Sequence, residues 1–549
     1  MRIGKAYKTV IFYIAVVFAA MAAYQIFPSI TIHDKNSSSF SSERVAADIN
    51  IISKRPHSIE HPKERKVVAN YLFHRLEQMG GDVQSFEYDS IKCKFGGYFN
   101  VENILATFEP PQGGDSSKYL LLVAHYDSRY HQKVLEDTVY SYGAADDGYG
   151  VGVILESVSQ ALKYQKEWSQ GIKVLFTDAE EHALDGMRNM ARYDNHILEN
   201  VNLVMNVEAR GVKGPVLLFE TSNGNSKVMK LYKHARGQYA YSLTTLVYRV
   251  LPNDTDFTVV KDSIPGFNFA VIDNLKYYHT NRDNFSNISL KSLQHYGLQM
   301  EPMVEEYLKN PQYSSKEAFV SEKDLVFFTI PVLGFFYFAK MEYIIINIAV
   351  FLLLAFVFLI YSKWKNVRIV NVFRCMKWPL LFSVGSFSVG ELIGWLSAHF
   401  NGEEFDFVSV KYVEYDYIIT IVSILVLLLW TLIFYRLKGR RSVHFSYEFI
   451  FAVLFFVAIL SFVLLVAFVE NFFILVPLAV TVIALLFGVV KLGRIMFLLS
   501  GIVIMLLGFS FCYILATALT IGSLGVVMML CWIYLSLLIG HYYLFKRNL

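Results

Sequence analysis

The chain has 549 residues, which is too long for a single domain, and 54% of them are hydrophobic while 18% are charged. This balance excludes a protein that is soluble throughout, because about a quarter of the residues are charged in typical soluble domains. The formal net charge of +3 indicates neither a nucleic acid nor another polyanion as a partner. The apolar excess is concentrated after residue 324, whereas residues 30–324 have the composition of a soluble domain.

An apolar run at residues 9–27 follows the basic residues Arg2, Lys5 and Lys8. Its length matches the hydrocarbon core of a bilayer, so we expect a retained membrane anchor within residues 1–29. Small residues between Ala19 and Ala23 leave a cleaved signal peptide open as an alternative. Either interpretation places the following domain outside the cytoplasm.

Residues 30–324 alternate between short apolar runs and helix-like segments. The runs at 119–124, 172–177 and 201–207 are too short for helices and predict buried strands. Residues 151–162 and 183–192 predict helices, and the polar insertion at 129–142, which begins with Arg129, predicts a surface loop. Alternating strands and helices are typical of an α/β fold. We therefore expect a mixed, mainly parallel sheet with helices on both faces.

Polar residues follow these predicted strands where ligands usually collect. His125 follows the first run, Asp146 precedes the predicted helix, and the pair Glu180 and Glu181 follows the second run. Because the carboxyl ends of parallel strands meet at one edge of a sheet, these side chains are expected in one crevice. A histidine surrounded by carboxylates suits a borderline metal such as zinc.

Two later residues complete the predicted site. Glu208 follows the third strand, and His279 lies much further along the chain. Taken singly, such residues are usually ordinary strand ends or helix caps. Taken together, they can hold two metals if Asp146 bridges them, and Glu180 is then free to act as a general base. The predicted metal ligands are His125, Asp146, Glu181, Glu208 and His279.

Several motifs in residues 53–308 resemble those of metallopeptidase family 28, the co-catalytic di-zinc exopeptidases. They are His125-Tyr126-Asp127-Ser128, Asp146-Asp147-Gly148, Asn253-Asp254-Thr255-Asp256-Phe257, His279-Thr280 with Asp283, and Leu293-Gln294-His295-Tyr296-Gly297. The resemblance implies the zinc exopeptidase fold, two zinc ions per chain and hydrolysis of peptides, most simply as an aminopeptidase. It also implies that Asp127 orients His125 and that Tyr278 steadies an oxyanion.

Two positions depart from the family pattern. Many members have an aspartate where Glu208 stands, although membrane-bound relatives often show Asn-x-Glu there. Arg210 replaces a residue that is usually small, so the substrate side of the site is expected to differ. The order of the parts resembles the membrane-bound group with endoplasmic reticulum metallopeptidase and vacuolar membrane protease, in which this domain precedes a multispanning tail.

The remaining chain predicts an interfacial connector at residues 325–342 and a membrane domain at 343–549. Seven spans are expected there, at 343–361, 379–397, 418–435, 447–469, 472–490, 495–513 and 523–545. With the first anchor they make eight, although the related group often has nine. Eight spans place every basic loop, including 363–377 and 436–441, on the same side as Arg2, whereas nine would not. The prediction is therefore an integral membrane protein with cytoplasmic termini and an extracytoplasmic catalytic domain, in the periplasm or an organelle lumen.

Three other functions remain open. A glutaminyl cyclase-like, single-zinc transferase shares the motif at 125–128, and the fold also occurs in non-enzymatic receptors. The tail can also be a transport or lipid-binding module. The expected partners are a peptide substrate and the lipid bilayer, without nucleic acid. Of the four cysteines only Cys93 lies in residues 30–324, so the soluble domain has no internal disulfide.

Overall fold

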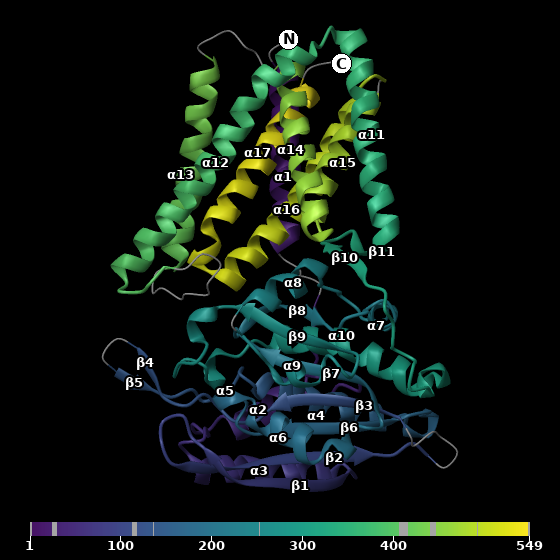
Figure 1. Cartoon of the computed structure of the whole chain (residues 1–549), viewed down its shortest axis with the longest axis vertical. Coiled ribbons are helices and arrows are strands. Elements are labelled where there is room, and N and C mark those ends of the chain that lie inside the picture. The colour runs from purple at the N-terminus through teal and green to yellow at the C-terminus, as the bar shows by residue number, and fades with distance from the viewer. Residues whose placement is uncertain are drawn as a thin grey trace. The chain divides into compact units, whose positions relative to one another are not determined.

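The computed structural model describes residues 3–24, 30–111, 118–134, 137–251, 253–405, 416–439, 446–490 and 492–546. The chain divides into two compact units, whose elements are labelled in Figure 1. One unit is Phe27–Phe327, and the other combines Met1–Ile26 with Phe328–Leu549. We describe each unit by itself.

A seven-stranded sheet in the order β1-β2-β6-β3-β7-β9-β8 forms the centre of the first unit. Its strands are β1 (Asp82–Lys92), β2 (Tyr98–Phe108), β3 (Tyr119–His125), β6 (Gly171–Thr177), β7 (Val201–Ala209), β8 (Lys213–Thr221) and β9 (Gly266–Asp273). The four central strands run parallel, while the pairings that add β1, β2 and β8 are antiparallel. Every residue of β3, β6 and β7 is buried, as expected for strands covered on both faces. The predicted mixed α/β fold is confirmed.

Helices cover both faces of this sheet (Figure 1). On one face α2 (Ser42–Ile52), α4 (Gly148–Leu162) and α10 (Leu290–Lys309) contact one another, and α4 packs on β3 and β7. On the other face α6 (Asp185–Tyr193) and α9 (Asp256–Val260) pack over an apolar cluster that includes Leu121, Val123 and Phe257. The remaining α-helices of the unit are α3 (Pro62–Gln78), α5 (Glu180–Ala183), α7 (Val228–Tyr232) and α8 (Ser242–Val250).

Two segments differ in detail from the sequence prediction. The segment at 129–142, expected as a polar loop, contains a small hairpin of β4 (Gln132–Val134) and β5 (Asp137–Val139). The expected helix at 183–192 is interrupted at Leu184, whose φ is +57°. The backbone turns there because the N–H groups of Asp185 and Gly186 donate back to the carbonyls of Ala179 and Asp178. This turn ends the short helix that carries the glutamate pair.

The second unit is a bundle of eight α-helices in the described residues. They are α1 (Ile3–Tyr24), α11 (Lys340–Lys365), α12 (Ile369–Phe400), α13 (Asp416–Gly439), α14 (Tyr447–Phe468), α15 (Phe472–Phe487), α16 (Gly493–Leu519) and α17 (Leu524–Lys546). Five helical stretches are long and apolar enough to cross a membrane, and the described apolar parts at Val10–Ala23, Ile418–Phe434 and Phe472–Phe487 are shorter. The predicted connector contains a two-stranded sheet of β10 (Leu325–Ile330) and β11 (Gly334–Ala339).

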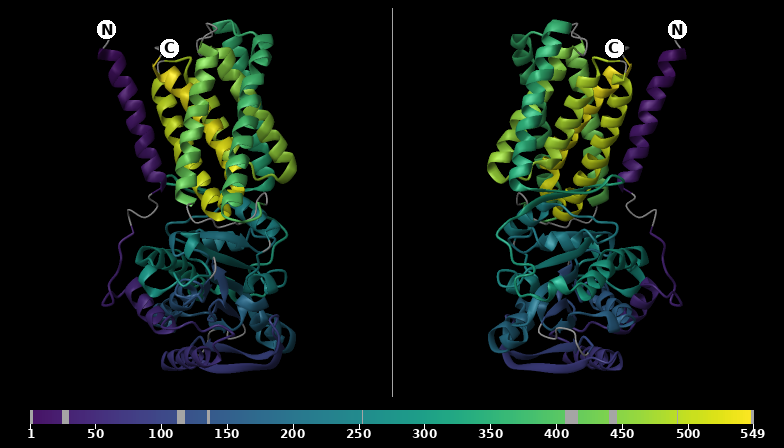
Figure 2. Two further views of the ribbon diagram at one scale, coloured as in Figure 1. Left: turned by 90° about the vertical axis from the view of Figure 1, so that its left-hand side faces the viewer. Right: turned by 90° about the vertical axis from the view of Figure 1, so that its right-hand side faces the viewer.

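The first helix is an integral part of this bundle. α1 packs on α16 and α17, and the ring of Phe12 lies 5.6 Å from that of Tyr542 and 5.7 Å from that of Phe545. The start of α1 and the end of α17 lie at the same end of the bundle (Figure 2). Several charged residues behind the topology prediction, in 406–415, 440–445, 491 and 547–549, lie outside the described residues.

Candidate metal centre

The sheet brings the predicted ligands together at the carboxyl ends of its parallel strands. His125 is the last residue of β3, Glu208 lies near the end of β7, and Glu181 lies in the helix that follows β6. His279 comes two residues after a short 3₁₀ helix, η3 (Leu275–Tyr277), that follows β9. These strands are neighbours in the sheet, so residues far apart in the sequence meet at one edge.

Asp146 enters the same place from the turn before α4. The carboxylate of Asp283 holds that turn by accepting from the backbone N–H groups of Ala145 at 2.7 Å and Asp146 at 3.2 Å. Asp147 caps α4, because its Oδ1 accepts from the N–H of Gly150 at 2.9 Å. The peptide bond between Asp146 and Asp147 is cis. The main chain of the turn is therefore fixed from both sides, with the Asp146 side chain directed to the histidines.

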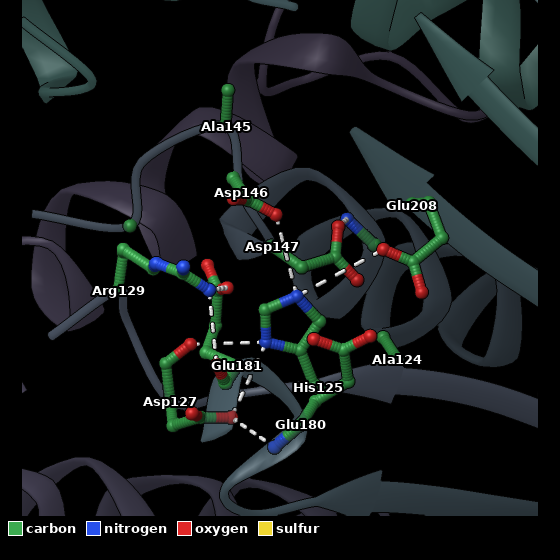
Figure 3. Close-up of polar contacts among 12 residues, drawn as sticks. Ala124, His125, Asp127, Arg129, Ala145, Asp146, Asp147, Glu180, Glu181 and Glu208 are labelled. Atoms are coloured by element: carbon green, nitrogen blue, oxygen red, sulfur yellow. Dashed lines mark hydrogen bonds and ion pairs between the residues drawn. The ribbon is translucent and has the colours of Figure 1, made fainter. Parts of the chain in front are cut away.

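One group of ligand atoms surrounds His125 (Figure 3). Its Nε2 lies 3.3 Å from Asp146 Oδ1 and 3.8 Å from Glu208 Oε2. The other ring nitrogen, Nδ1, lies 3.0 Å from the carbonyl oxygen of Asp127 and 3.4 Å from its carboxylate. Nδ1 therefore donates to Asp127, which turns the lone pair of Nε2 toward the two carboxylates.

A second group forms around His279, on the other oxygen of Asp146. His279 Nε2 lies 3.3 Å from Asp146 Oδ2 and 3.2 Å from Glu181 Oε1. His279 has a positive φ of +59°. Ala179, just before the glutamate pair, also has a positive φ, of +56°. Such a backbone conformation costs about 1 kcal/mol or more for a residue other than glycine, and it is concentrated at functional sites. In both groups the potential ligand atoms lie within 4.8 Å of one another.

The two groups have the composition and spacing of a metal site. His125, Asp146 and Glu208 form one triad, and Asp146, Glu181 and His279 form the other. Asp146 Oδ2, Glu181 Oε1 and His279 Nε2 are buried, and none has a hydrogen-bond partner among the described residues. Buried polar atoms are normally satisfied, so three unsatisfied atoms facing one point indicate a missing cation. Imidazole with carboxylate donors fits zinc.

The electrostatics of the two triads also favour bound cations. Burial raises the pKa of Glu208 to about 8, and the nearby charge of Asp146 adds to the effect although His125 opposes it. Burial would lower the pKa of His125, but the charges of Glu180 and Asp127 raise it well above its usual value. The site thus gathers more negative charge than its histidines neutralise, and bound cations would take the place of these protons.

Glu180 and Tyr278 lie beside the triads. The N–H of Glu180 donates to Asp127 Oδ1 at 3.0 Å, so Asp127 contacts both His125 and the loop that carries Glu180. Burial raises the pKa of Glu180 well above its usual range; His125 opposes this shift and Glu208 adds to it. The ring of Tyr278 stacks on His279 at 3.6 Å between centroids. Burial and the charges of Asp146 and Glu181 raise the pKa of the Tyr278 hydroxyl.

Sequence reasoning missed Arg129, which we placed in a polar loop. Its Nη1 donates to Glu181 Oε2 at 2.8 Å and to the carbonyl oxygen of Glu181 at 3.0 Å. Its guanidinium also lies 4.1 Å from the ring centroid of Tyr130. Burial acts to raise the pKa of Glu181, yet His279 and Arg129 hold that pKa well below its usual range. The only signal in the sequence was a cation four residues after His125.

The fold and the site define a metallopeptidase-type α/β domain followed by membrane-type helices. Residues 103–304 match the model of peptidase family M28. This part of the chain matches the family that its motifs resemble.

The relatives support the same assignment. Endoplasmic reticulum metallopeptidase 1 of Mus musculus is 28% identical over 40% of this chain and 24% of its own length. A vacuolar membrane protease of Schizosaccharomyces japonicus is 28% identical over 45% of this chain and 29% of its own length. The matched segment therefore spans only about a quarter of these relatives, and the membrane-bound group expected from the sequence is confirmed.

Solved structures resemble the same half of the chain. A glutaminyl cyclase of Porphyromonas gingivalis superposes with a TM-score of 0.41 and 21% identity, covering 49% of this chain and 99% of its own. A Zn-dependent exopeptidase of Parabacteroides distasonis superposes with a TM-score of 0.39 and 20% identity, covering 48% of this chain and 98% of its own.

Proposed function

We propose that the protein is a membrane-anchored, zinc-dependent exopeptidase that acts as an aminopeptidase. The observation that carries this proposal is the position of Asp146, whose two oxygens face two different histidines. His125, Asp146 and Glu208 would hold one zinc ion, and Asp146, Glu181 and His279 the other. When bound, such a metal pair polarises the scissile carbonyl and lowers the pKa of a water molecule to roughly 7.

The remaining residues supply proton transfer and positioning. Glu180 is the general base: its raised pKa lets its carboxylate take a proton near neutral pH and return it to the leaving amine. Asp127 holds the ring of His125 and accepts from the Glu180 N–H, so it fixes ligand and base relative to each other. We assign to Tyr278 the role of steadying the oxyanion through its hydroxyl, from its place against His279.

We propose four parts for the chain: an anchor at 1–29, the peptidase domain at 30–324, a connector at 325–342 and a membrane domain at 343–549 with seven spans. The described helices overlap the eight predicted spans, which supports this division, and an even number of spans would place both termini on one side. With Lys363, Lys365 and Arg368 in the cytoplasm, the peptidase domain is extracytoplasmic, in the periplasm or an organelle lumen. Its substrates would then be peptides on that side of the membrane.

The experiment that tests this function uses the full-length protein in detergent micelles. Bound zinc is counted by elemental analysis. Activity is measured on aminoacyl substrates, on peptides that report release of the C-terminal residue, and on peptides with an N-terminal glutamine. Two zinc ions per chain with aminoacyl hydrolysis support the proposal. One zinc ion with cyclisation of the glutamine would make the protein a glutaminyl cyclase instead. A folded protein without zinc would point to a non-enzymatic receptor.

A further inference from the structure

A row of polar side chains crosses the interior of the sheet beside the metal centre. Asn206 on β7, Asn268 on β9 and Glu220 on β8 are each 0% exposed. The strands are adjacent, and Asn268 is the direct register partner of both Asn206 and Glu220. Uncompensated polar groups at such positions cost about 1–3 kcal/mol each, so the row calls for an explanation beyond packing.

The row is continuous and ends on a metal ligand. Asn206 Nδ2 donates to Glu208 Oε1 at 3.0 Å and to Asn268 Oδ1 at 3.0 Å. Asn268 Nδ2 in turn donates to Glu220 Oε2 at 3.2 Å and to Thr255 Oγ1 at 2.8 Å. The oxygen of Glu208 that Asn206 contacts is Oε1, whereas Oε2 faces His125. The row therefore holds the ligand by the oxygen that the first triad does not use.

The far end of the row determines the direction of every hydrogen bond in it. The Glu220 carboxylate accepts from Asn268, so Asn268 presents its N–H to Glu220 and its oxygen to Asn206. Asn206 must then present its own N–H groups to Asn268 and to Glu208. Lys261 pairs with the other oxygen of Glu220: its Nζ lies 2.7 Å from Glu220 Oε1, and its side chain is 21% exposed. A charge near the surface thus fixes a donor at the metal centre.

We propose that Glu220, Asn268 and Asn206 are positioning residues that hold Glu208 as a ligand of the first metal site. The proposal rests on the proposed function, because it assumes that His125, Asp146 and Glu208 bind zinc. Among the predicted metal ligands, the hydrogen bonds of the described row reach only Glu208, so we expect its effect to be confined to that site. The other triad, with Glu181 and His279, is held by separate contacts.

The test is the zinc affinity of full-length variants in detergent, measured by competition with a chromophoric chelator. In Glu220→Gln the residue at the end of the row can donate as well as accept, so it no longer fixes the direction of the amides. We expect one of the two zinc ions to bind about 10- to 100-fold more weakly, as is typical when an outer partner of a ligand is lost. The second ion should keep its affinity within about twofold.

The matched control is Glu156→Gln. Glu156 is 3% exposed and pairs with Arg44, which is 27% exposed, so this substitution also removes a buried carboxylate from an ion pair. It hydrogen-bonds to Ser41, Arg44 and Gln160 and to no metal ligand. A purely structural role for Glu220 predicts that both variants lose thermal stability while both retain zinc affinity. A positioning role predicts that only Glu220→Gln loses affinity.

A milder pair of variants guards against misfolding of Glu220→Gln. Lys261→Met removes the cation that pairs with Glu220, so the buried carboxylate loses its partner at the far end of the row. We expect about a tenfold loss at the same site, and Lys261→Arg should restore the affinity. Unchanged zinc binding in Glu220→Gln, or in Lys261→Met if the former does not fold, would overturn the inference. A wild-type protein that binds no zinc would refute the proposed function itself.

Discussion

A single guanidinium nitrogen of Arg129 contacts both the carboxylate and the main-chain carbonyl of Glu181, at 2.8 and 3.0 Å. This contact occupies Oε2 of Glu181 and leaves Oε1 facing His279. The side chain thus presents one oxygen to the second triad. Arg129 also offsets part of the negative charge that Asp146 and Glu181 gather there.

Replacing Arg129 by methionine should make the second metal site more sensitive to acid. Burial raises the pKa of Glu181, and the charge of Arg129 opposes this effect. Without that charge the pKa should rise, so the Glu181 carboxylate takes up a proton at a higher pH. Because that proton competes with zinc, the pH at which one ion is lost should rise by about 1 unit or more. Zinc retained after dialysis between pH 4 and 7 measures this shift. Arg192→Met is the control, since Arg192 lies over Tyr193 but contacts no ligand; an identical acid profile for both variants would contradict the prediction.

The variant Glu180→Gln should retain both zinc ions yet hydrolyse substrate about 10²- to 10⁴-fold more slowly, because only the base is removed. Initial rates and elemental analysis on the same sample provide the measurement. Glu167→Gln, at an exposed carboxylate paired with Lys309, is the control and should leave both values unchanged. Turnover of Glu180→Gln near the normal rate would exclude Glu180 as the base.

The number of zinc ions that a variant binds should depend on whether the lost ligand belongs to one triad or, like Asp146, to both. Glu208→Ala and His279→Ala each remove a ligand from one triad, so each variant should retain about one ion tightly, whereas Asp146→Ala should lose both. Zinc is counted after dialysis against a weak chelator. An Asp146→Ala protein that still carries two ions would rule out the bridging role.

His295 should make the protein less stable in acid, independently of the metal centre. Its Nδ1 accepts from the N–H of Val216 at 2.9 Å, its Nε2 donates to the carbonyl of Gly237 at 2.8 Å, and burial lowers its pKa to about 4. An unfolded histidine has a pKa of about 6.5, so the unfolded state binds more protons between these values. This contribution is complete above pH 6.5 and is lost as the pH falls toward 4, in total about 3 kcal/mol.

The corresponding measurement compares the Tm of the wild type and His295→Gln in a metal-free buffer from pH 7 to 4. The variant should be less stable at pH 7, and the difference should shrink as the pH falls. His74→Gln, at an exposed histidine, should follow the wild type throughout. A constant difference between wild type and His295→Gln would mean that His295 does not titrate in this range.

Reporter fusions test the topology. A reporter after Leu549 should behave as cytoplasmic and one within residues 401–417 as extracytoplasmic, because basic residues near short loops resist translocation. Most of that loop lies outside the described residues, so the expectation rests on the sequence. Both reporters on the same side of the membrane would exclude the eight-span arrangement.

The strands and site residues that could be predicted are those for which the pattern of apolar and polar residues along the chain directly reflects burial in the fold. Continuous apolar runs identified β3, β6 and β7, and the polar residues directly after them identified His125 and the glutamate pair. Arg129 could not be found in this way, because its role depends on the distance between its own loop and the short helix that carries Glu181. Asn206, Asn268 and Glu220 escaped notice for a related reason: each is an isolated polar residue in an apolar strand, and only the register aligns them.

The aromatic contacts of Phe12 bear on the maturation of the chain. This ring is 3% exposed and packs against Tyr542 and Phe545. Proteolytic removal of the first apolar segment would strip the last helix of this cover and open a groove to lipid. The first helix is thus a packed part of the bundle, and its start lies at the same end of the bundle as the end of α17.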